Sequence, residues 1–143
     1  MTLRDLLFGS GATSRATDLG LLVLRFGIGI PMLLAHGIGK IPPSDGFIEG
    51  TAAMGFPLPV LFAWAAALAE TVGGLFVAIG LLTRPSAFFV AFTMGVAFFV
   101  RHGEDPFGER ELAFVFLVGF LAVMVAGAGR YAVDGWIRQR EAA

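Results

Sequence analysis

Four long apolar stretches limit what this chain can fold into. They cover about residues 19–40, 58–82, 85–101 and 111–128, and glycine, proline and charged residues separate them. As helices rising 1.5 Å per residue they would measure about 33, 37, 26 and 26 Å, against about 30 Å for the hydrocarbon core of a bilayer. Each stretch therefore predicts a membrane-spanning helix.

The composition agrees with a membrane protein and excludes several functions. Hydrophobic residues make up 57% of the chain and charged residues 15%, whereas soluble domains carry about 25% charged residues. The net charge of −1 offers no basic surface for nucleic acid. The chain has no cysteine, so it cannot hold an iron–sulfur cluster or relay electrons through its own thiols. The first apolar stretch is too long for a signal peptide, so we expect it to remain in the mature protein.

These features predict an all-α integral membrane four-helix bundle. We expect the bundle over residues 18–134, between short tails at 1–17 and 135–143. Only "TRP" connects the second and third stretches, which predicts a tight antiparallel hairpin with Pro85 in the first turn of the third helix. The longer first loop predicts a short interfacial helix at about residues 47–54.

The distribution of basic residues predicts the orientation in the membrane, because cytoplasmic loops carry an excess of lysine and arginine. One side holds both termini and the turn between the second and third helices. Its basic residues are Arg4, Arg15, Arg84, Arg130, Arg138 and Arg140. The other side has fewer basic residues and several acidic ones, namely Lys40, Arg101 and Arg110 with Asp45, Glu49, Glu104, Asp105 and Glu109. Both termini are therefore predicted to be cytoplasmic.

Ionisable residues interrupt the first two apolar stretches. "LRFGIGIPMLLAHGIGK" places Arg25, His36 and Lys40 on one helical face, and "AWAAALAETVGG" contains Glu70. If helical rise is counted from the inner surface, Arg25 lies about 9 Å deep, Glu70 about 18 Å and His36 about 26 Å. An ionised side chain at mid-membrane costs about 2.5–3.5 kcal/mol unless it is paired or hydrated. We therefore expect Glu70 to pair with Arg25, or to reach His36 through a water; such a pair is structural, functional or both.

A second polar cluster, "RHGEDPFGERE", follows the third stretch and contains His102 and Glu111. We expect Glu111 to open the fourth helix, where the helix dipole favours a carboxylate. The alternative is a role in proton transfer with His36 or His102. His102 is also compatible with a plain solvated loop residue, and the ligand spacing supports no metal site.

Phenylalanine is frequent in the third stretch, at Phe88, Phe89, Phe92, Phe98 and Phe99. Two interpretations are open: these rings pack against helices and lipid, or they line a pocket for a flat apolar molecule.

Five motifs in order resemble the DoxX family of small four-helix bacterial inner-membrane proteins. They are "LRFGIGIPMLLAHGIGK", "GFPLP", "LAETVGGLFVAIGLLTRPSA", "RHGEDPFGERELAFVF" and "GAGRYAVD", and they extend from about residue 18 to residue 134. The resemblance implies quinone-linked redox chemistry, because relatives include a subunit of thiosulfate:quinone oxidoreductase and a component of a membrane oxidoreductase complex in oxidative-stress defence. The family's polar positions correspond to Arg25, His36, Gly37, Lys40, Glu70, His102 and Glu111. The chain departs from the family at Phe116, where we expect tyrosine, and at Pro31, in a helix expected to lack proline.

The leading hypothesis is a quinone-interacting subunit of a membrane-associated oxidoreductase complex, inactive alone and without an intrinsic cofactor. Glu70, His36 and Glu111 would transfer protons. Arg25, Glu70, Lys40 and His102 would bind the quinone or an anion. Besides the lipid bilayer, this hypothesis requires a soluble or membrane redox partner, and a homo-oligomer is a further option. The alternatives are a non-catalytic anchor or assembly partner for a soluble redox enzyme, and a carrier of a small hydrophobic compound.

Overall fold

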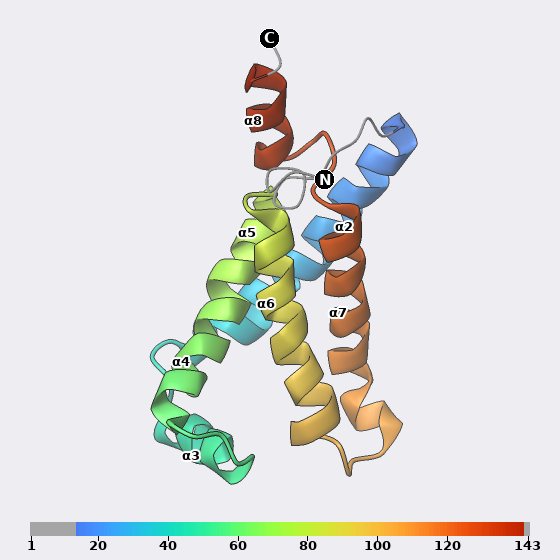
Figure 1. Ribbon diagram of the computed structural model, residues 1–143. Coiled ribbons are helices and arrows are strands. Elements are labelled where there is room, and N and C mark those ends of the chain that lie inside the picture. The colour runs from blue at the N-terminus through green and yellow to red at the C-terminus, as the bar shows by residue number, and fades with distance from the viewer. Residues whose placement is uncertain (1–13, 142–143) are drawn as a thin grey trace.

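The structure is a computed structural model that describes residues 14–141, and every regular element in that range is helical. The first span consists of α2 (Arg15–Pro31), the π-helical η1 (Met32–Gly37) and the 3₁₀ turn η2 (Ile38–Lys40). The short helix α3 (Asp45–Ala53) follows, and then the second span of α4 (Pro59–Leu68), η3 (Ala69–Gly73) and α5 (Gly74–Ile79). The remaining elements are α6 (Thr83–Val96), η4 (Ala97–Arg101), α7 (Phe107–Ala126) and α8 (Val133–Glu141). Figure 1 shows α3 at one end of the bundle and α8 at the other.

Within residues 14–141, three helical segments are long and apolar enough to cross a membrane, namely Arg15–Lys40, Pro59–Ile79 and Thr83–Arg101. The prediction of an all-α membrane protein is therefore confirmed. α7 has 20 residues, but its first turns contain Glu109, Arg110 and Glu111, and its apolar part starts only at Leu112. A fourth span along α7 remains a prediction, as does the cytoplasmic position of the termini.

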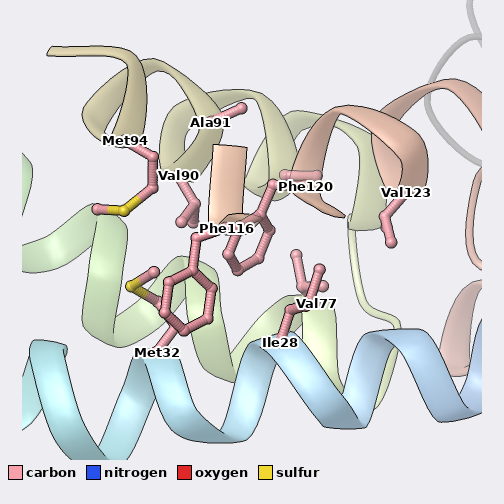
Figure 2. Packing of buried hydrophobic residues seen from close by; sticks show 10 residues of the cluster. Ile28, Met32, Val77, Val90, Ala91, Met94, Phe116, Phe120 and Val123 are labelled. Atoms are coloured by element: carbon pink, nitrogen blue, oxygen red, sulfur yellow. The ribbon is translucent and has the colours of Figure 1, made fainter. Parts of the chain in front are cut away.

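The core lies where all the long segments meet. Ile28 and Met32 of the first span point toward Val77 of α5, and toward Phe116 and Phe120 of α7 (Figure 2). α6 completes the cluster with Val90, Ala91 and Met94. Because lipid is as apolar as these side chains, close packing holds membrane helices together more than transfer from water does.

One glycine shows how closely the first two spans pack. A Cβ on Gly29 would lie 2.7 Å from the carbonyl oxygen of Gly74, so only glycine allows α2 and α5 to approach backbone to backbone. This approach brings the polar residues of the two spans within reach of each other.

The tight hairpin between the second and third spans is confirmed, but three residues earlier than expected. α5 ends at Ile79 because Gly80 adopts a left-handed conformation with φ of 74°, and α6 already begins at Thr83. The "TRP" sequence is thus the first turn of α6, with Pro85 inside it as predicted. The short helix expected at about residues 47–54 is present as α3, and its interfacial position remains a prediction. The residues from 135 onward, which were predicted as a C-terminal tail, belong to the helix α8, which begins at Val133.

Candidate functional site

An apolar cleft of about 630 Å³ lies between α3, α4 and the α6–η4 segment. Figure 1 shows α4 and α6 diverging toward the end of the bundle that carries α3. Small residues of α3 and α4 leave the space open, and phenylalanines surround it. The aromatic lining residues are Phe47, Phe56, Phe62, Phe88, Phe89 and Phe92. The interpretation of the phenylalanine-rich third stretch as a pocket wall is thus supported for Phe88, Phe89 and Phe92, whereas Phe98 and Phe99 are not among the residues that line this cleft.

An ion pair lies at the wall of this apolar cleft. Lys40 Nζ donates to both carboxylate oxygens of Glu70, at 2.7 Å to Oε1 and 2.6 Å to Oε2. Glu70 is 2% exposed, whereas the Lys40 side chain is 32% exposed. The ammonium also lies 5.3 Å from the ring centroid of Phe47, within cation–π range. Lys40 therefore reaches from a buried carboxylate toward the open part of the cleft.

Local helix geometry brings the two charged residues together. Gly37 of η1 packs directly on Thr71 of η3, where a Cβ would lie 2.7 Å from the Thr71 Cα and Oγ1 atoms. This contact sets the spacing of the two spans just beside Glu70. Lys40 then ends η2, at the edge of the span, and its long side chain returns to the carboxylate.

Each of the three membrane-spanning segments contains a π-helical turn near its polar residues. η1 contains His36, η3 contains Glu70, and η4 ends at Arg101. π-helical turns within α-helices occur frequently at functional sites, because the extra residue redirects neighbouring side chains. Pro31 is the last residue of α2, directly before η1, and it lacks the N–H that would bond to the carbonyl oxygen of Gly27.

His102 lies at the mouth of the cleft, in the turn after η4. Its Nδ1 atom is 2.7 Å from Asp105 Oδ2, and the ring lines the cleft. In the described part of the chain, no group of three His, Cys, Asp or Glu side chains is arranged to hold a metal ion.

Comparison with known proteins gives the relationship of the chain. A family profile described as DoxX matches residues 20–103, more than half of the sequence. The chain belongs to the DoxX family.

Two relatives of this DoxX protein come from Escherichia coli (strain K12). Inner membrane protein YqjF is 34% identical over 132 residues, which cover 86% of this chain and 95% of the relative. Inner membrane protein YphA is 29% identical over 142 residues, which cover 93% of this chain and 97% of the relative. Putative oxidoreductase CatD of Bacillus subtilis (strain 168) is 28% identical over 125 residues, which cover 87% of this chain and 91% of the relative. No solved structure matches the chain. The family and the spanning helices confirm the prediction of a multi-pass membrane protein.

The expected pair between Arg25 and Glu70 is not what the DoxX protein forms. Arg25 is fully buried, and its guanidinium donates to the carbonyl oxygens of Val77 at 3.3 Å, of Ala78 at 2.8 Å, and of Tyr131. The last carbonyls of a helix lack partners within the helix and carry partial negative charge. Arg25 donates hydrogen bonds to such carbonyls at the end of α5, while Lys40 forms the ion pair with Glu70. Arg25 does not line the cleft, and its part in a head-group site remains a prediction.

The structure does not join His36 and Glu111 to the cleft. The half-buried His36 ring packs edge-on against Phe116 of α7, with ring centroids 5.4 Å apart. Neither His36 nor Glu111 lines the cleft. Glu111 is exposed in the second turn of α7, which begins at Phe107, so Glu109 rather than Glu111 occupies the first turn. The predicted proton route through His36 and Glu111 remains a prediction.

Two buried aspartates are not among the polar residues that the sequence indicated. Asp134 is fully buried and accepts hydrogen bonds from the backbone N–H groups of Leu82 at 2.8 Å and Thr83 at 2.9 Å, and from the Thr83 hydroxyl at 2.7 Å. Asp18 is 2% exposed and accepts from the backbone N–H of Arg130 at 2.8 Å. Together with Arg25, they attach the segment before α8 to the ends of the first three spans. These ends lie on the side that the basic residues predict to be cytoplasmic. The "GAGRYAVD" motif was a signal for this role, but its backbone partners cannot be identified from sequence.

Proposed function

We propose that this DoxX protein binds a membrane-soluble quinone in the cleft between α3, α4 and α6, as a subunit of an inner-membrane oxidoreductase complex. One observation carries the proposal: a phenylalanine-lined cleft of about 630 Å³ with an ion pair of Lys40 and Glu70 at its wall. Binding sites of about 300–1,000 Å³ with mostly apolar walls and few polar groups are typical for small organic ligands. The relative named putative oxidoreductase supports a redox role.

The cleft offers both kinds of contact that a quinone needs. Phenylalanine rings provide flat apolar surface for the ring and tail. Lys40 uses two of its three N–H donors on Glu70, which leaves one for a quinone carbonyl oxygen. Glu70 offers acceptor capacity to a quinol hydroxyl. The site thereby suits both the oxidised and the reduced head group.

The position of the cleft suggests entry from the bilayer. Phe88, Phe89 and Phe92 lie on a candidate spanning helix and are 50%, 58% and 58% exposed. A quinone dissolved in lipid would meet these rings before it reaches the ion pair. Electrons would be exchanged with a redox partner protein, and Glu70 would accept the hydrogen bond of the reduced head group.

Binding is testable by tryptophan fluorescence in lipid nanodiscs. Trp136→Phe leaves Trp64, on α4, as the reporter. We expect saturable quenching by a short-chain quinone, and about ten-fold weaker binding in Lys40→Met, because a hydrogen bond from a charged donor contributes about 1.5–3 kcal/mol. Arg130→Met, in the same Trp136→Phe background, removes one charge at the opposite end of the bundle. It should bind the quinone as tightly as Trp136→Phe alone. Quenching that rises linearly with quinone in all three proteins would contradict the proposal.

A second candidate function is an anchor for a soluble redox enzyme, favoured by the position of α8. Figure 1 shows this helix projecting beyond the bundle. It carries an exposed Trp136 with the Arg140 guanidinium 3.8 Å from its ring centroid, and tryptophan and arginine are frequent in the energetic centres of interfaces. Removal of residues 136–143 should then prevent assembly with a partner while quinone binding is retained; unaltered assembly would exclude α8 as the anchor.

A further inference from the structure

A histidine–aspartate pair lies in the turn between η4 and α7, where His102 is one of the residues that line the cleft. The Nδ1 atom of His102 is 2.7 Å from Oδ2 of Asp105, and each side chain is 40% exposed. The second ring nitrogen, Nε2, has no hydrogen-bond partner among the described residues. The Nδ1 side of the His102 ring is therefore held by Asp105, while the Nε2 side is available to the cleft and to water.

The turn that carries His102 is held in place by two further contacts. Arg110 Nη1 donates to the carbonyl oxygen of Gly103 at 3.0 Å, and its guanidinium stacks 4.9 Å from the ring centroid of Phe98. A Cβ on Gly103 would lie 2.5 Å from the carbonyl oxygen of Phe99, so the turn packs closely against η4. The imidazole is thus attached to a constrained turn rather than to a free loop.

The charged groups around His102 are of both signs. Asp105 contacts its ring, Glu104 is an exposed neighbour, and Arg110 lies on the first turn of α7. Within the cleft, Arg101 and the pair of Lys40 and Glu70 share the lining with His102. Arg101 favours a negative charge on a bound ligand.

A carboxylate bound to Nδ1 has a defined chemical consequence. It favours the tautomer with the proton on Nδ1, leaves the Nε2 lone pair free, and stabilises the imidazolium that forms when Nε2 accepts a proton. An imidazole held in this way is a suitable general base for a hydroxyl group at its open side.

We propose that His102, positioned by Asp105, accepts the proton of a weakly acidic hydroxyl group on a ring-shaped ligand in the cleft, such as a hydroxyquinone or quinol. The ligand O–H bond breaks and an Nε2–H bond forms, leaving an oxyanion near Arg101 and an imidazolium beside Asp105. The exposed imidazole then releases the proton to water. This inference rests on the proposed quinone site and adds the substrate class and the proton acceptor.

A ligand that changes colour on ionisation tests the inference directly. A 3-alkyl-2-hydroxy-1,4-naphthoquinone absorbs differently as the hydroxyl and as the oxyanion. We would titrate it over pH in phosphatidylcholine nanodiscs with the protein, and in empty nanodiscs as the reference. The bound ligand should ionise about one pH unit lower with wild-type protein, which is a ten-fold stabilisation of the oxyanion. His102→Gln and Asp105→Asn should each remove most of this shift, while Glu104→Gln, which changes the exposed neighbouring carboxylate, should retain it.

The outcomes separate this inference from the proposed function. Saturable Trp64 quenching without a shift, or a shift that survives His102→Gln, would overturn the role of His102 and leave the quinone site intact. Absence of saturable quenching in the wild type would overturn both. Because Asp105 is only a positioning residue, Asp105→Asn provides a second test if His102→Gln fails to fold.

Discussion

The ammonium group of Lys40 lies 2.7 and 2.6 Å from the two carboxylate oxygens of Glu70, on the neighbouring span. This ion pair joins the end of η2 to the middle of the second span, and it forms part of the wall of the cleft. A polar group buried in a membrane needs a partner, and Lys40 provides one for the Glu70 carboxylate. The same pair provides a donor and an acceptor to a ligand.

The two partners of this pair should contribute unequally to stability. Lys40→Met leaves a carboxylate that is 2% exposed without a cation, and should lower the free energy of unfolding by about 3 kcal/mol. Glu70→Gln leaves the partly exposed Lys40 with access to water, and should cost only about 1 kcal/mol. The double variant should recover much of the loss in Lys40→Met, as thermal unfolding in detergent would show. Additive losses would indicate that the two residues do not interact.

Two glycines near the cleft form a matched pair for testing the helix contact. A Cβ on Gly37 would lie 2.7 Å from the Thr71 Cα, whereas a Cβ on Gly39 would meet nothing within 4 Å. Gly37→Ala should separate η1 from η3, lower the melting temperature by several degrees and weaken quinone binding. Gly39→Ala should have little effect. Equal behaviour of the two variants would refute the proposed close contact.

Substitution of Arg25 should lower the stability of the fold, although this residue is not expected to contact a ligand. Its guanidinium donates to carbonyls of α5 and to Tyr131, and a lysine ammonium cannot reproduce this planar arrangement. Arg25→Lys should lower the free energy of unfolding by about 2 kcal/mol, since buried carbonyls lose their donors. The exposed Arg130→Lys is the control. Quinone affinity, measured below the melting temperature, should be unchanged; a selective loss of affinity would place Arg25 in the site after all.

Asp134 should be important for the start of α6. Its carboxylate accepts from Leu82, from Thr83 and from the Thr83 hydroxyl, so Asp134→Asn removes acceptor capacity and the favourable charge at the helix N-terminus. We expect a loss of about 1–2 kcal/mol and faster hydrogen exchange at Thr83. Glu109→Gln, in the exposed first turn of α7, should have little effect on either measurement.

The sequence was sufficient to predict the class of fold, because hydrophobic stretches of membrane length have few alternatives. It also indicated which polar residues are unusual. It did not predict which of them pair. The depth estimate placed Arg25 beside Glu70 by assuming uniform α-helical rise, whereas η1 and η3 change the helical repeat near His36 and Glu70, and Lys40 reaches back into the bundle.

The remaining failures share a physical cause, since the partners of the polar groups are backbone atoms. Arg25 binds carbonyls at the end of α5, and Asp134 binds N–H groups at the start of α6. Every residue has such atoms, so no pattern of side chains identifies the ones that a distant residue will contact. The cleft itself depends on the divergence of α4 and α6, which hydrophobicity does not encode.

Photo-crosslinking would test the quinone site most directly. A diazirine-bearing quinone would be irradiated with the protein in nanodiscs, and the adducts would be located by mass spectrometry with and without excess unmodified quinone. We expect adducts at the end of α3 and on the cleft-facing side of α6, around Met54 and Phe92, that excess quinone suppresses. Adducts concentrated on the exposed face of α7, around Val115 and Val118, and insensitive to competition would contradict it.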